Sequence, residues 1–396
     1  MISSPETVNT PQEQPAAVAS RRRLFSIGLP ANLDAAERRF PLTPEGARTL
    51  IDQGFAIKME RGASATIHYT DNQYATEGVR IVDRTEAFGA DIVIHLAPLT
   101  PADVKKLRRG AMLLTLMNAG RMTCDTLQAL LDRHVITLDM NLIKDDRGNY
   151  PFGDILEEID GRAAMARASS FLADSVHGKG ILMGGVAGVG PCEVTIIGSG
   201  IAASSAARSA MGAGALVRMF DHDVYRLREA TRTLGPGVVA SAMHPRVLTN
   251  ALRTADVVVY TNVTPMPVFD AETIGMMKRG VIIFDLTPCP GKAFVSLPTI
   301  DLAVASPLDN SPTEVSRACY VNAGSAAART AAMALSNTFA TMFRRIVDSE
   351  GVSNALNLYP GLQCAALTFL GKIVSTRLAE AFGRRSVDLR IFLTLS

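Results

Sequence analysis

Short apolar runs alternate with stretches of helical apolar spacing from residue 25 onward. This alternation is typical of strand–helix–strand units that build a parallel sheet. In the first part of the chain the runs predict strands at Leu24–Gly28, Ala56–Glu60, Asp91–Leu96, Met112–Met117 and Val135–Leu138. Helices are expected between them, each closed by Gly or a basic residue, at Pro44–Gln53, Pro101–Leu107 and Cys124–Arg133. This part of the chain therefore predicts one open α/β unit.

A second α/β series follows a break in this pattern. The turn-rich segment 144–151 closes the first unit, with a boundary near Pro151. Residues 157–177 contain few breakers and have the apolar spacing of a long linking helix. After the glycine-rich loop 178–190, strands are expected at Glu193–Ile197, Leu216–Phe220, Asp256–Tyr260, Val281–Phe284 and Leu302–Ala305. The tail from about residue 329 is rich in helix-forming residues, so we expect it to be helical.

Charge and composition exclude several classes of partner. Forty Lys and Arg against 38 Asp and Glu leave a net charge of +2 without a long run of one sign, so we expect no nucleic-acid partner. No stretch approaches the roughly 18 uninterrupted apolar residues of a membrane span, so we expect no membrane partner. Five scattered cysteines without metal-ligand spacing indicate reduced thiols, a cytoplasmic location and no metal site. Residues 1–20 lack the features of a targeting peptide and are expected to form a disordered tail.

The strongest chemical signal lies where the apolar run at 194–197 meets Gly198-x-Gly200-x-x-Ala203 and an Ala/Ser-rich helix. In this pattern the first glycine makes a tight turn, the second lets the backbone approach a pyrophosphate, and the third small residue allows close helix–strand packing. Asp221 follows after a second strand, where a carboxylate accepts hydrogen bonds from an adenosine ribose and repels a 2'-phosphate. We therefore expect NAD as the cofactor, with NADP less favoured; nearby basic side chains are the alternative determinant.

Motifs before and after this fingerprint form a set. They are Ile27–Pro30 (IGLP), Glu37–Gly46 (ERRFPLTPEG), Gly178–Val186 (GKGILMGGV), Cys319–Asn322 (CYVN) and Ala334–Asn337 (ALSN). Together they resemble the alanine dehydrogenase and pyridine nucleotide transhydrogenase family over about residues 24–380. The resemblance implies an α/β fold with two Rossmann-like doubly wound domains and a cleft between them that holds the substrate.

The same resemblance implies a division of the chain. Residues 21–150 together with 329–396 would form the substrate-binding, catalytic domain, and residues 151–328 the NAD-binding domain. Asn322 falls in the last loop that contacts the cofactor in this family. Self-association into a homo-oligomer would use the helix around Gly161 to Val176.

By position, Arg39 matches the arginine that grips the substrate carboxylate in the family. A planar guanidinium is suited to this because it holds a carboxylate with two parallel hydrogen bonds. The alternative is that Arg38 and Arg39 form a solvated basic pair.

Three other family positions carry different residues here. The proton-handling lysine is replaced by Leu96 or Ala97, the histidine falls on Asn118, and the aspartate falls on Cys289, which we expect to be a small buried side chain. The substituted side chains cannot perform the same acid–base work near neutral pH.

Two titratable residues at expected strand ends are candidates to replace the lost groups. His95 could face the cleft as an acid–base group, because imidazole titrates near neutrality, or its ring could be satisfied by the backbone. Asp139 could bind a substrate ammonium group or cap a turn. We interpret His95, Asn118 and Asp139 as the candidate catalytic set.

These departures favour reduction of an imine over deamination of alanine. Deamination requires a base for the ammonium group and an acid–base group for the carbinolamine, whereas a preformed iminium requires mainly positioning and carboxylate binding. The string Leu138-Asp139 with Ile143–Gly148 (IKDDRG) also resembles the N5-(carboxyethyl)ornithine synthase branch, which joins a 2-oxo acid to an amino acid; a hydrated turn is the alternative for that string. We therefore expect an NAD(H)-dependent enzyme that forms opine-type products from a 2-oxo acid and an amino acid. Alternatives are oxidative deamination of a small amino acid, and NAD(H) binding without catalysis.

Overall fold

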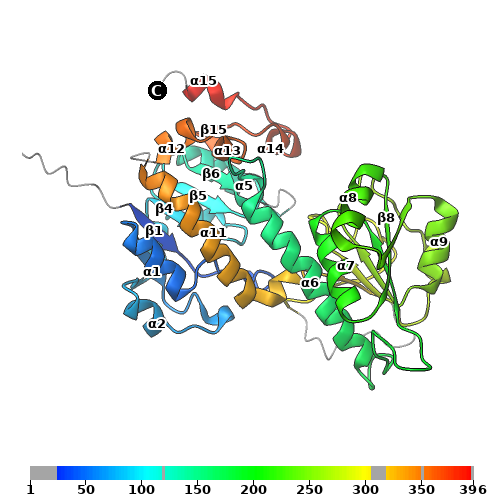
Figure 1. The fold of residues 1–396 in the computed structure, drawn as a ribbon. Coiled ribbons are helices and arrows are strands. Elements are labelled where there is room, and N and C mark those ends of the chain that lie inside the picture. Colours follow the sequence, from blue (N-terminus) through cyan, green and yellow to red (C-terminus); the bar gives the residue numbers. More distant parts are fainter. Residues whose placement is uncertain (1–24, 118–120, 305–317, 349–351, 394–396) are drawn as a thin grey trace, which may run out of the picture.

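The computed structural model describes residues 25–117, 121–304, 318–348 and 352–393. Two sheets, each with helices on both faces, form two bodies that are joined by long helices (Figure 1). The expected α/β class with two Rossmann-like units is confirmed. The tail 1–20, Asn118 and Ala305 lie outside the described residues.

The first sheet has the strand order β15-β14-β6-β5-β4-β1-β2-β3. Its parallel part, from β3 to β6, follows the doubly wound order 3-2-1-4-5-6, in which ligands bind where the order reverses, here beyond β1 and β4. Strands β14 and β15 extend the sheet in antiparallel fashion beside β6. The strands are β1 (Ser26–Leu29), β2 (Ala56–Glu60), β3 (Arg80–Val82), β4 (Ile92–Ile94), β5 (Met112–Thr115), β6 (Ile136–Asp139), β14 (Ala366–Phe369) and β15 (Lys372–Ile373).

Helices cover both faces of this sheet. On one face, Leu50 and Phe339 join the main core, and on the other, Phe88, Val104 and Leu130 form a second cluster. The helices of this body are α1 (Pro44–Asp52), α2 (Asp71–Thr76), α3 (Arg84–Phe88), α4 (Pro101–Val104), α5 (Cys124–Asp132), α11 (Ala328–Asp348), α12 (Val352–Leu358), α13 (Pro360–Gln363), α14 (Thr376–Ala381) and α15 (Leu389–Leu393), with short 3-10 turns η1 (Ala65–Ile67) and η2 (Met140–Leu142).

The second sheet is parallel throughout and has the order β12-β13-β11-β10-β7-β8-β9. Its strand order reverses between β7 and β10. The same rule therefore predicts that a ligand of the second sheet binds beyond the ends of these two strands. The strands are β7 (Glu193–Ile197), β8 (Leu216–Asp221), β9 (Val238–Ala242), β10 (Val257–Tyr260), β11 (Ile282–Asp285), β12 (Thr299–Asp301) and β13 (Cys319–Val321), and the other elements are α7 (Ile201–Gly212), α8 (Val224–Leu234), α9 (Pro245–Thr254), α10 (Ala271–Met276) and η3 (Gly324–Ala327).

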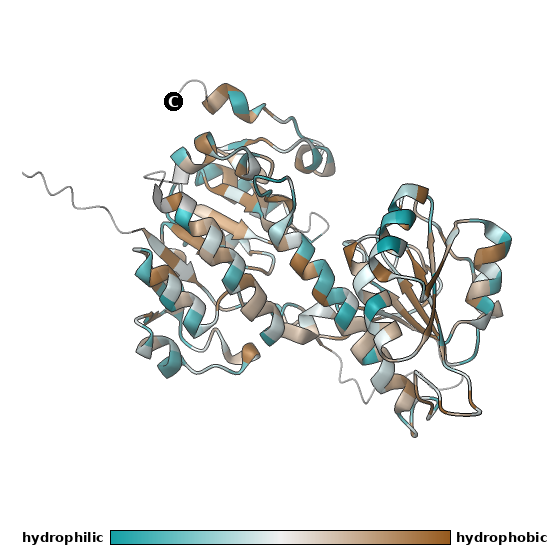
Figure 2. Ribbon diagram, in the orientation of Figure 1, coloured by the Kyte–Doolittle hydropathy of each residue, from teal (hydrophilic) through white to brown (hydrophobic). Residues whose placement is uncertain are grey.

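Helix α6 (Pro151–Ala173) belongs to both bodies. Phe152 and Leu156 near its start pack into the core of the first sheet, and Ala164 and Met165 beyond its middle pack into the core of the second. In Figure 1 this helix runs from one body to the other, and Figure 2 shows the apolar strands enclosed by helices with mixed surfaces. Residues in the middle of α6 therefore lie where the two bodies meet.

Most expected elements are present, with specific differences. The strand expected at Leu302–Ala305 is wrong: β12 ends at Asp301, whose Oδ1 accepts a hydrogen bond from the Ala303 amide and so makes a turn there. Strands β3 and β13 were not predicted because each has only three residues, and β9 because it is an edge strand with a weak apolar pattern. Strands β14 and β15 were missed because they lie in a tail with helical composition. Within the described residues, no helix is both long and apolar enough to cross a membrane.

Candidate functional site

The fingerprint turn lies between β7 and α7, at the point where the second sheet reverses its order. Gly198 has φ +112°, and a Cβ on it would stand 2.0 Å from Thr261 Oγ1 at the end of β10, so the fold itself requires glycine there. A Cβ on Gly200 would meet nothing within 4 Å. Ala203 is fully buried in the core of this body. The open space at Gly200 is what a cofactor that approaches the backbone needs.

The first turn of α7 offers amides to an anion. Its N-cap is Gly200, which supplies no side-chain acceptor, whereas Asp223 caps α8 by accepting from two backbone amides. Glu157 of α6 lies beside this turn and accepts a hydrogen bond from the Ala202 amide; burial raises its pKa. The turn is therefore suited to a pyrophosphate, with one carboxyl group next to it.

Asp221 ends β8 and is buried, 4 % exposed. Its Oδ2 accepts a hydrogen bond from Ser199 Oγ at 2.6 Å, and its Oδ1 accepts from the Asp223 amide at 3.0 Å. Each carboxylate oxygen has a second lone pair, so both can still accept from a ribose hydroxyl. Ser199, between the two glycines, thus fixes the carboxylate beside the fingerprint turn, and these residues fit the adenosine end of NAD.

Arg39 lies in the loop after β1 and is held by Glu37. Arg39 Nε donates to Glu37 Oε1 at 2.8 Å and Nη2 donates to Oε2 at 2.5 Å, and the two side chains are 13 % and 8 % exposed. The ion pair with Glu37 raises the pKa of Arg39 despite its burial. Because Glu37 takes the Nε edge of the guanidinium, the Nη1 edge is the one that can receive a substrate carboxylate. Arg39 therefore is not a solvated surface group.

The loop that carries Arg39 is bonded to the segment after β13. Asn322, with φ +60°, donates from Nδ2 to the Ala36 carbonyl at 2.5 Å and to Asp301 Oδ1 at 3.1 Å. Ser325 Oγ donates to the same Ala36 carbonyl, and the Arg38 amide donates to Ser325 Oγ. The predicted substrate arginine and the predicted cofactor residue Asn322 are thus brought to one junction between the two bodies.

Two family models match most of the chain. The model of the alanine dehydrogenase/PNT N-terminal domain matches residues 28–152, and that of the C-terminal domain matches residues 164–376. The chain belongs to the alanine dehydrogenase/PNT family. The resemblance read from the motifs is confirmed, and with it the class of NAD(H)-dependent oxidoreductases that act on carbon–nitrogen bonds.

Individual relatives span nearly the whole chain. An alanine dehydrogenase of Staphylococcus haemolyticus is 28 % identical over 372 residues, which are 91 % of this chain and 96 % of the relative. Among solved structures, an L-alanine dehydrogenase superposes with a TM-score of 0.79 at 22 % identity, covering 91 % of this chain and 99 % of that chain. The transhydrogenase from Sinorhizobium meliloti has a TM-score of 0.69 at 18 % identity, covering 89 % and 99 %. These two structures show a shared fold.

The end of β4, where the alanine dehydrogenase/PNT resemblance implies a lysine, is apolar. Leu96 and Ala97 are 2 % and 1 % exposed. The His95 ring is also buried; its Nδ1 is 2.8 Å from the Ala97 carbonyl oxygen, and its Nε2 forms no hydrogen bond within the part of the chain that the structure describes. Burial lowers the pKa of His95, so the imidazole is neutral at pH 7 and Nδ1 donates to Ala97. His95 therefore has the backbone contact expected of a strand-end histidine.

Asp139 ends β6 and caps the turn that follows. Its Oδ1 accepts from the Asn141 amide at 3.0 Å and from the Met117 amide at 3.3 Å, and burial raises its pKa. It thereby fixes the segment that leads to position 118. The further segment 143–148 forms a turn around Asp145, whose Oδ1 accepts from the amides of Arg147 and Asn149.

Cys289, at the position of the family aspartate, is exposed, so the expectation of a small buried side chain is wrong. Cys289 lies in a loop after β11, and this loop is closed by a hydrogen bond from the Gly291 amide to the Asp285 carboxylate. The five cysteines are free. In the described part of the chain, no group of three His, Cys, Asp or Glu side chains is placed to hold a metal ion.

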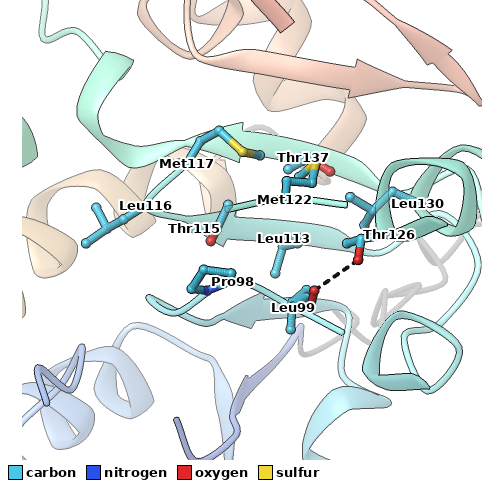
Figure 3. Close-up of a pocket in the computed structure, with 10 residues that line it drawn as sticks. All are labelled: Pro98, Leu99, Leu113, Thr115, Leu116, Met117, Met122, Thr126, Leu130 and Thr137. Carbon is cyan, nitrogen blue, oxygen red and sulfur yellow. Dashed lines mark hydrogen bonds between the residues drawn. The ribbon is translucent and has the colours of Figure 1, made fainter. Parts of the chain in front are cut away.

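Two cavities of the first body, as far as the structure describes it, are poorly suited to an anion. A cavity of about 20 Å³ beside β5 is lined by apolar side chains and threonines (Figure 3), and it has room for about one water molecule. An open hollow of about 470 Å³ at the ends of β2 and β3 contains Arg84. Arg84 binds Asp103 through Nε and Nη2 and binds Glu60 through Nη1, so its edges are already occupied. Arg39 is the better anchor for a substrate carboxylate.

Two residues of this junction were not predicted from the sequence. Glu37 precedes Arg39 by two positions. A carboxylate so close to a predicted substrate arginine was the sequence feature that could have indicated their ion pair. Asp160 lies in the middle of α6, and burial raises its pKa to about 6. An acidic residue between apolar positions of a linking helix was its only sequence signal.

Proposed function

We propose that this protein reduces the C=N bond of an imine formed from a 2-oxo acid and a primary amine, with NADH as the reductant. The substrate would lie in the cleft against residues 21–150 and 329–396, and the cofactor against residues 151–328. The product is a secondary amine that carries a carboxylate on each side when the amine is an amino acid. This is the opine-type reaction suggested by the local similarity to the N5-(carboxyethyl)ornithine synthase branch.

One observation carries the proposal: at the end of β4 buried apolar side chains stand where the family has its lysine, and His95 beside them is buried as well. Leu96 and Ala97 are buried, and the His95 ring is neutral with Nδ1 bonded to the backbone. Oxidation of alanine needs a base for the ammonium group and an acid–base group while water adds and ammonia leaves. An imine that forms in solution needs no such relay at that strand end, so an apolar end of β4 is compatible with its reduction.

The remaining residues have defined tasks in this reaction. Arg39, fixed by Glu37, binds the carboxylate derived from the 2-oxo acid with its outer edge. Gly198, Gly200 and Ala203 shape the turn for the pyrophosphate, and Asp221 accepts the ribose hydroxyls and disfavours NADP. When bound, NADH supplies the hydride that reduces the carbon. Asn322 and Asp139 hold the backbone segments at the cleft rather than exchange protons.

The experiment is a comparison of amines. Consumption of NADH is measured with pyruvate and either ammonia or a panel of primary amino acids at equal free-base concentration. We expect turnover with at least one amino acid and none with ammonia. Because the imine forms without the enzyme, the rate at a fixed pH should follow the free-base concentration of the amine. Equal or better turnover with ammonia would contradict the proposal.

Oxidative deamination of a small amino acid is the second candidate. Its support is the series of relatives named alanine dehydrogenase, which are 27–28 % identical over about nine-tenths of the chain. It predicts robust NAD-dependent oxidation of L-alanine by the unmodified protein. That reaction would require another acid–base residue in place of the lysine and histidine of the family.

A further inference from the structure

Asp160 contacts the junction that the two predicted binding sites share. It lies on α6 between Leu156, in the core of the first body, and Ala164, in the core of the second. Its carboxylate meets the segment after β13, where a Cβ on Gly324 would stand 1.9 Å from Asp160 Oδ1. Only glycine at 324 allows this approach, and the Gly324 amide donates a hydrogen bond to the carboxylate.

The charges around Asp160 do not cancel. Arg39 attracts the carboxylate, but the Arg39 guanidinium is already neutralised by its two hydrogen bonds to Glu37. Glu37 and, one turn earlier on α6, Glu157 add negative charge near Asp160. Among the described residues, Asp160 forms no ion pair of its own. Beyond the Glu37–Arg39 pair the junction carries two carboxylates, Asp160 and Glu157, and Arg226 acts on the second. This excess of negative charge favours a cation next to Asp160.

A substrate of the proposed reaction carries both charges that this arrangement lacks. The outer edge of Arg39 accepts a carboxylate, and the nitrogen of an α-amino acid or an iminium bears the positive charge. We propose that Asp160 is the carboxylate that pairs with this substrate nitrogen and that, in its acid form, donates the proton when an imine binds. In that transfer the O–H bond of Asp160 breaks and an N–H bond forms, so the iminium faces the carboxylate left behind; Asp160 then regains a proton from water.

The titration of Asp160 suits this role. Burial raises its pKa to about 6, while Arg39 and the Gly324 amide oppose that shift and Glu37 adds to it. A neighbouring ammonium group would lower this pKa, and a neighbouring carboxylate without an ammonium group would raise it. L-Alanine should therefore release protons on binding near pH 6, whereas propionate should take them up.

This inference rests on the proposed substrate class, but not on the choice between imine reduction and deamination, because both substrates carry a cationic nitrogen. The probes are L-alanine and propionate, which differ only in the ammonium group and do not react with NADH. Their affinities for the full chain loaded with NADH are measured by titration calorimetry. The variant is Asp160→Asn, whose amide oxygen can still accept from the Gly324 amide.

We expect Asp160→Asn to weaken L-alanine binding by at least about tenfold and to leave propionate binding unchanged or up to about fivefold tighter. Glu158→Gln removes a neighbouring charge that pairs with Arg162 on the exposed side of α6, and it should leave the ratio of the two affinities unchanged. Near pH 6, release of about half a proton with L-alanine should occur in the wild type and be absent from Asp160→Asn.

A purely structural role for Asp160 would change both affinities in the same direction. That result, or no change in either affinity, would overturn the inference. Wild-type protein that binds propionate but not L-alanine, or neither probe, would overturn it as well. Failure of the proposed reaction appears separately, as turnover with ammonia by the wild-type protein.

Discussion

Glu37 holds Arg39 through two hydrogen bonds, from Nε to Oε1 and from Nη2 to Oε2, and so leaves the Nη1 edge of the guanidinium unpaired by Glu37. A free arginine side chain loses considerable rotamer entropy when it binds a ligand, and this pairing removes much of that freedom in advance. The negative charge of Glu37 also offsets the positive charge of Arg39. If Arg39 anchors the substrate carboxylate as proposed, the edge that Glu37 leaves unpaired is the one that binds it.

Replacement of Arg39 tests its role as the carboxylate anchor. Arg39→Met removes a charge-assisted contact worth a few kcal/mol, so turnover should fall by at least about a hundredfold while NADH affinity is unchanged. Because Arg39→Met also leaves Glu37 unpaired, Arg39→Lys is measured beside it; Lys keeps the charge but lacks the second edge and should lose affinity for the 2-oxo acid. Arg38→Met is the control at an exposed neighbour. Unchanged kinetics in both Arg39 variants would remove this residue from the site.

The pair should also matter for stability. Glu37→Ala leaves the Arg39 charge largely buried without its partner, which costs about 3–5 kcal/mol of unfolding free energy. The matched control is Asp52→Ala, because Asp52 pairs with Arg48 at the surface, where both side chains are more than half exposed; its cost should stay below about 1 kcal/mol. Urea unfolding measures both. Equal costs for the two variants would show that the buried pair contributes no more than a surface pair.

Gly200 should be needed for the cofactor and not for the fold. In Gly200→Ala the new methyl group meets no protein atom within 4 Å, and the backbone angles, φ −73° and ψ −167°, suit alanine. We expect an unchanged melting temperature and NADH affinity at least about tenfold lower, because the methyl group occupies the space for the pyrophosphate. Gly212→Ala, also in open space but at the far end of α7, should leave NADH affinity intact. Undiminished NADH binding in Gly200→Ala would place the pyrophosphate elsewhere.

Asp221 should set the preference for NADH over NADPH. In Asp221→Ser the carboxylate that repels a 2'-phosphate is lost, so NADH binding should weaken and the gap to NADPH should narrow, by about tenfold in the ratio of dissociation constants. Asp223→Ser is the control, since serine still caps α8 by accepting from its first amides. This control also removes the exposed ion pair of Asp223 with Arg226, so it shows what the release of that arginine does by itself. A wild-type preference for NADPH would assign the choice to the neighbouring basic side chains instead.

The sequence predicted the scaffold better than the chemistry of the junction. Strands at β2 and β7 were predicted to the residue, because their apolar residues, alternating in β2 and continuous in β7, are bounded by turn residues. The edge strands β3 and β9 were missed, since edge strands have weaker apolar patterns. Asp160 could not be recognised, because its proximity to Gly324 and Arg39 arises from long-range packing of α6 against segments far away in the chain.

The local motifs show the same contrast. The glycine fingerprint and Asp221 could be proposed from the sequence because a dinucleotide site uses one short strand–turn–helix segment and the next strand end. For His95 the sequence allowed a role in the cleft or a backbone contact, and the structure shows the backbone contact. Burial of the strand end decides between such alternatives, and burial depends on the whole fold.

The most direct test of the proposed imine reduction is the mass of the product. The protein is incubated with NADH, pyruvate, ¹⁵N-labelled ammonium and an unlabelled primary amino acid together. The amine products are then separated, and their molecular masses are measured by mass spectrometry. We predict a secondary amine that joins the three-carbon acid to the unlabelled amino acid and contains no ¹⁵N. Accumulation of ¹⁵N-labelled alanine as the main product would contradict imine reduction with a primary amine and establish alanine dehydrogenation in its place.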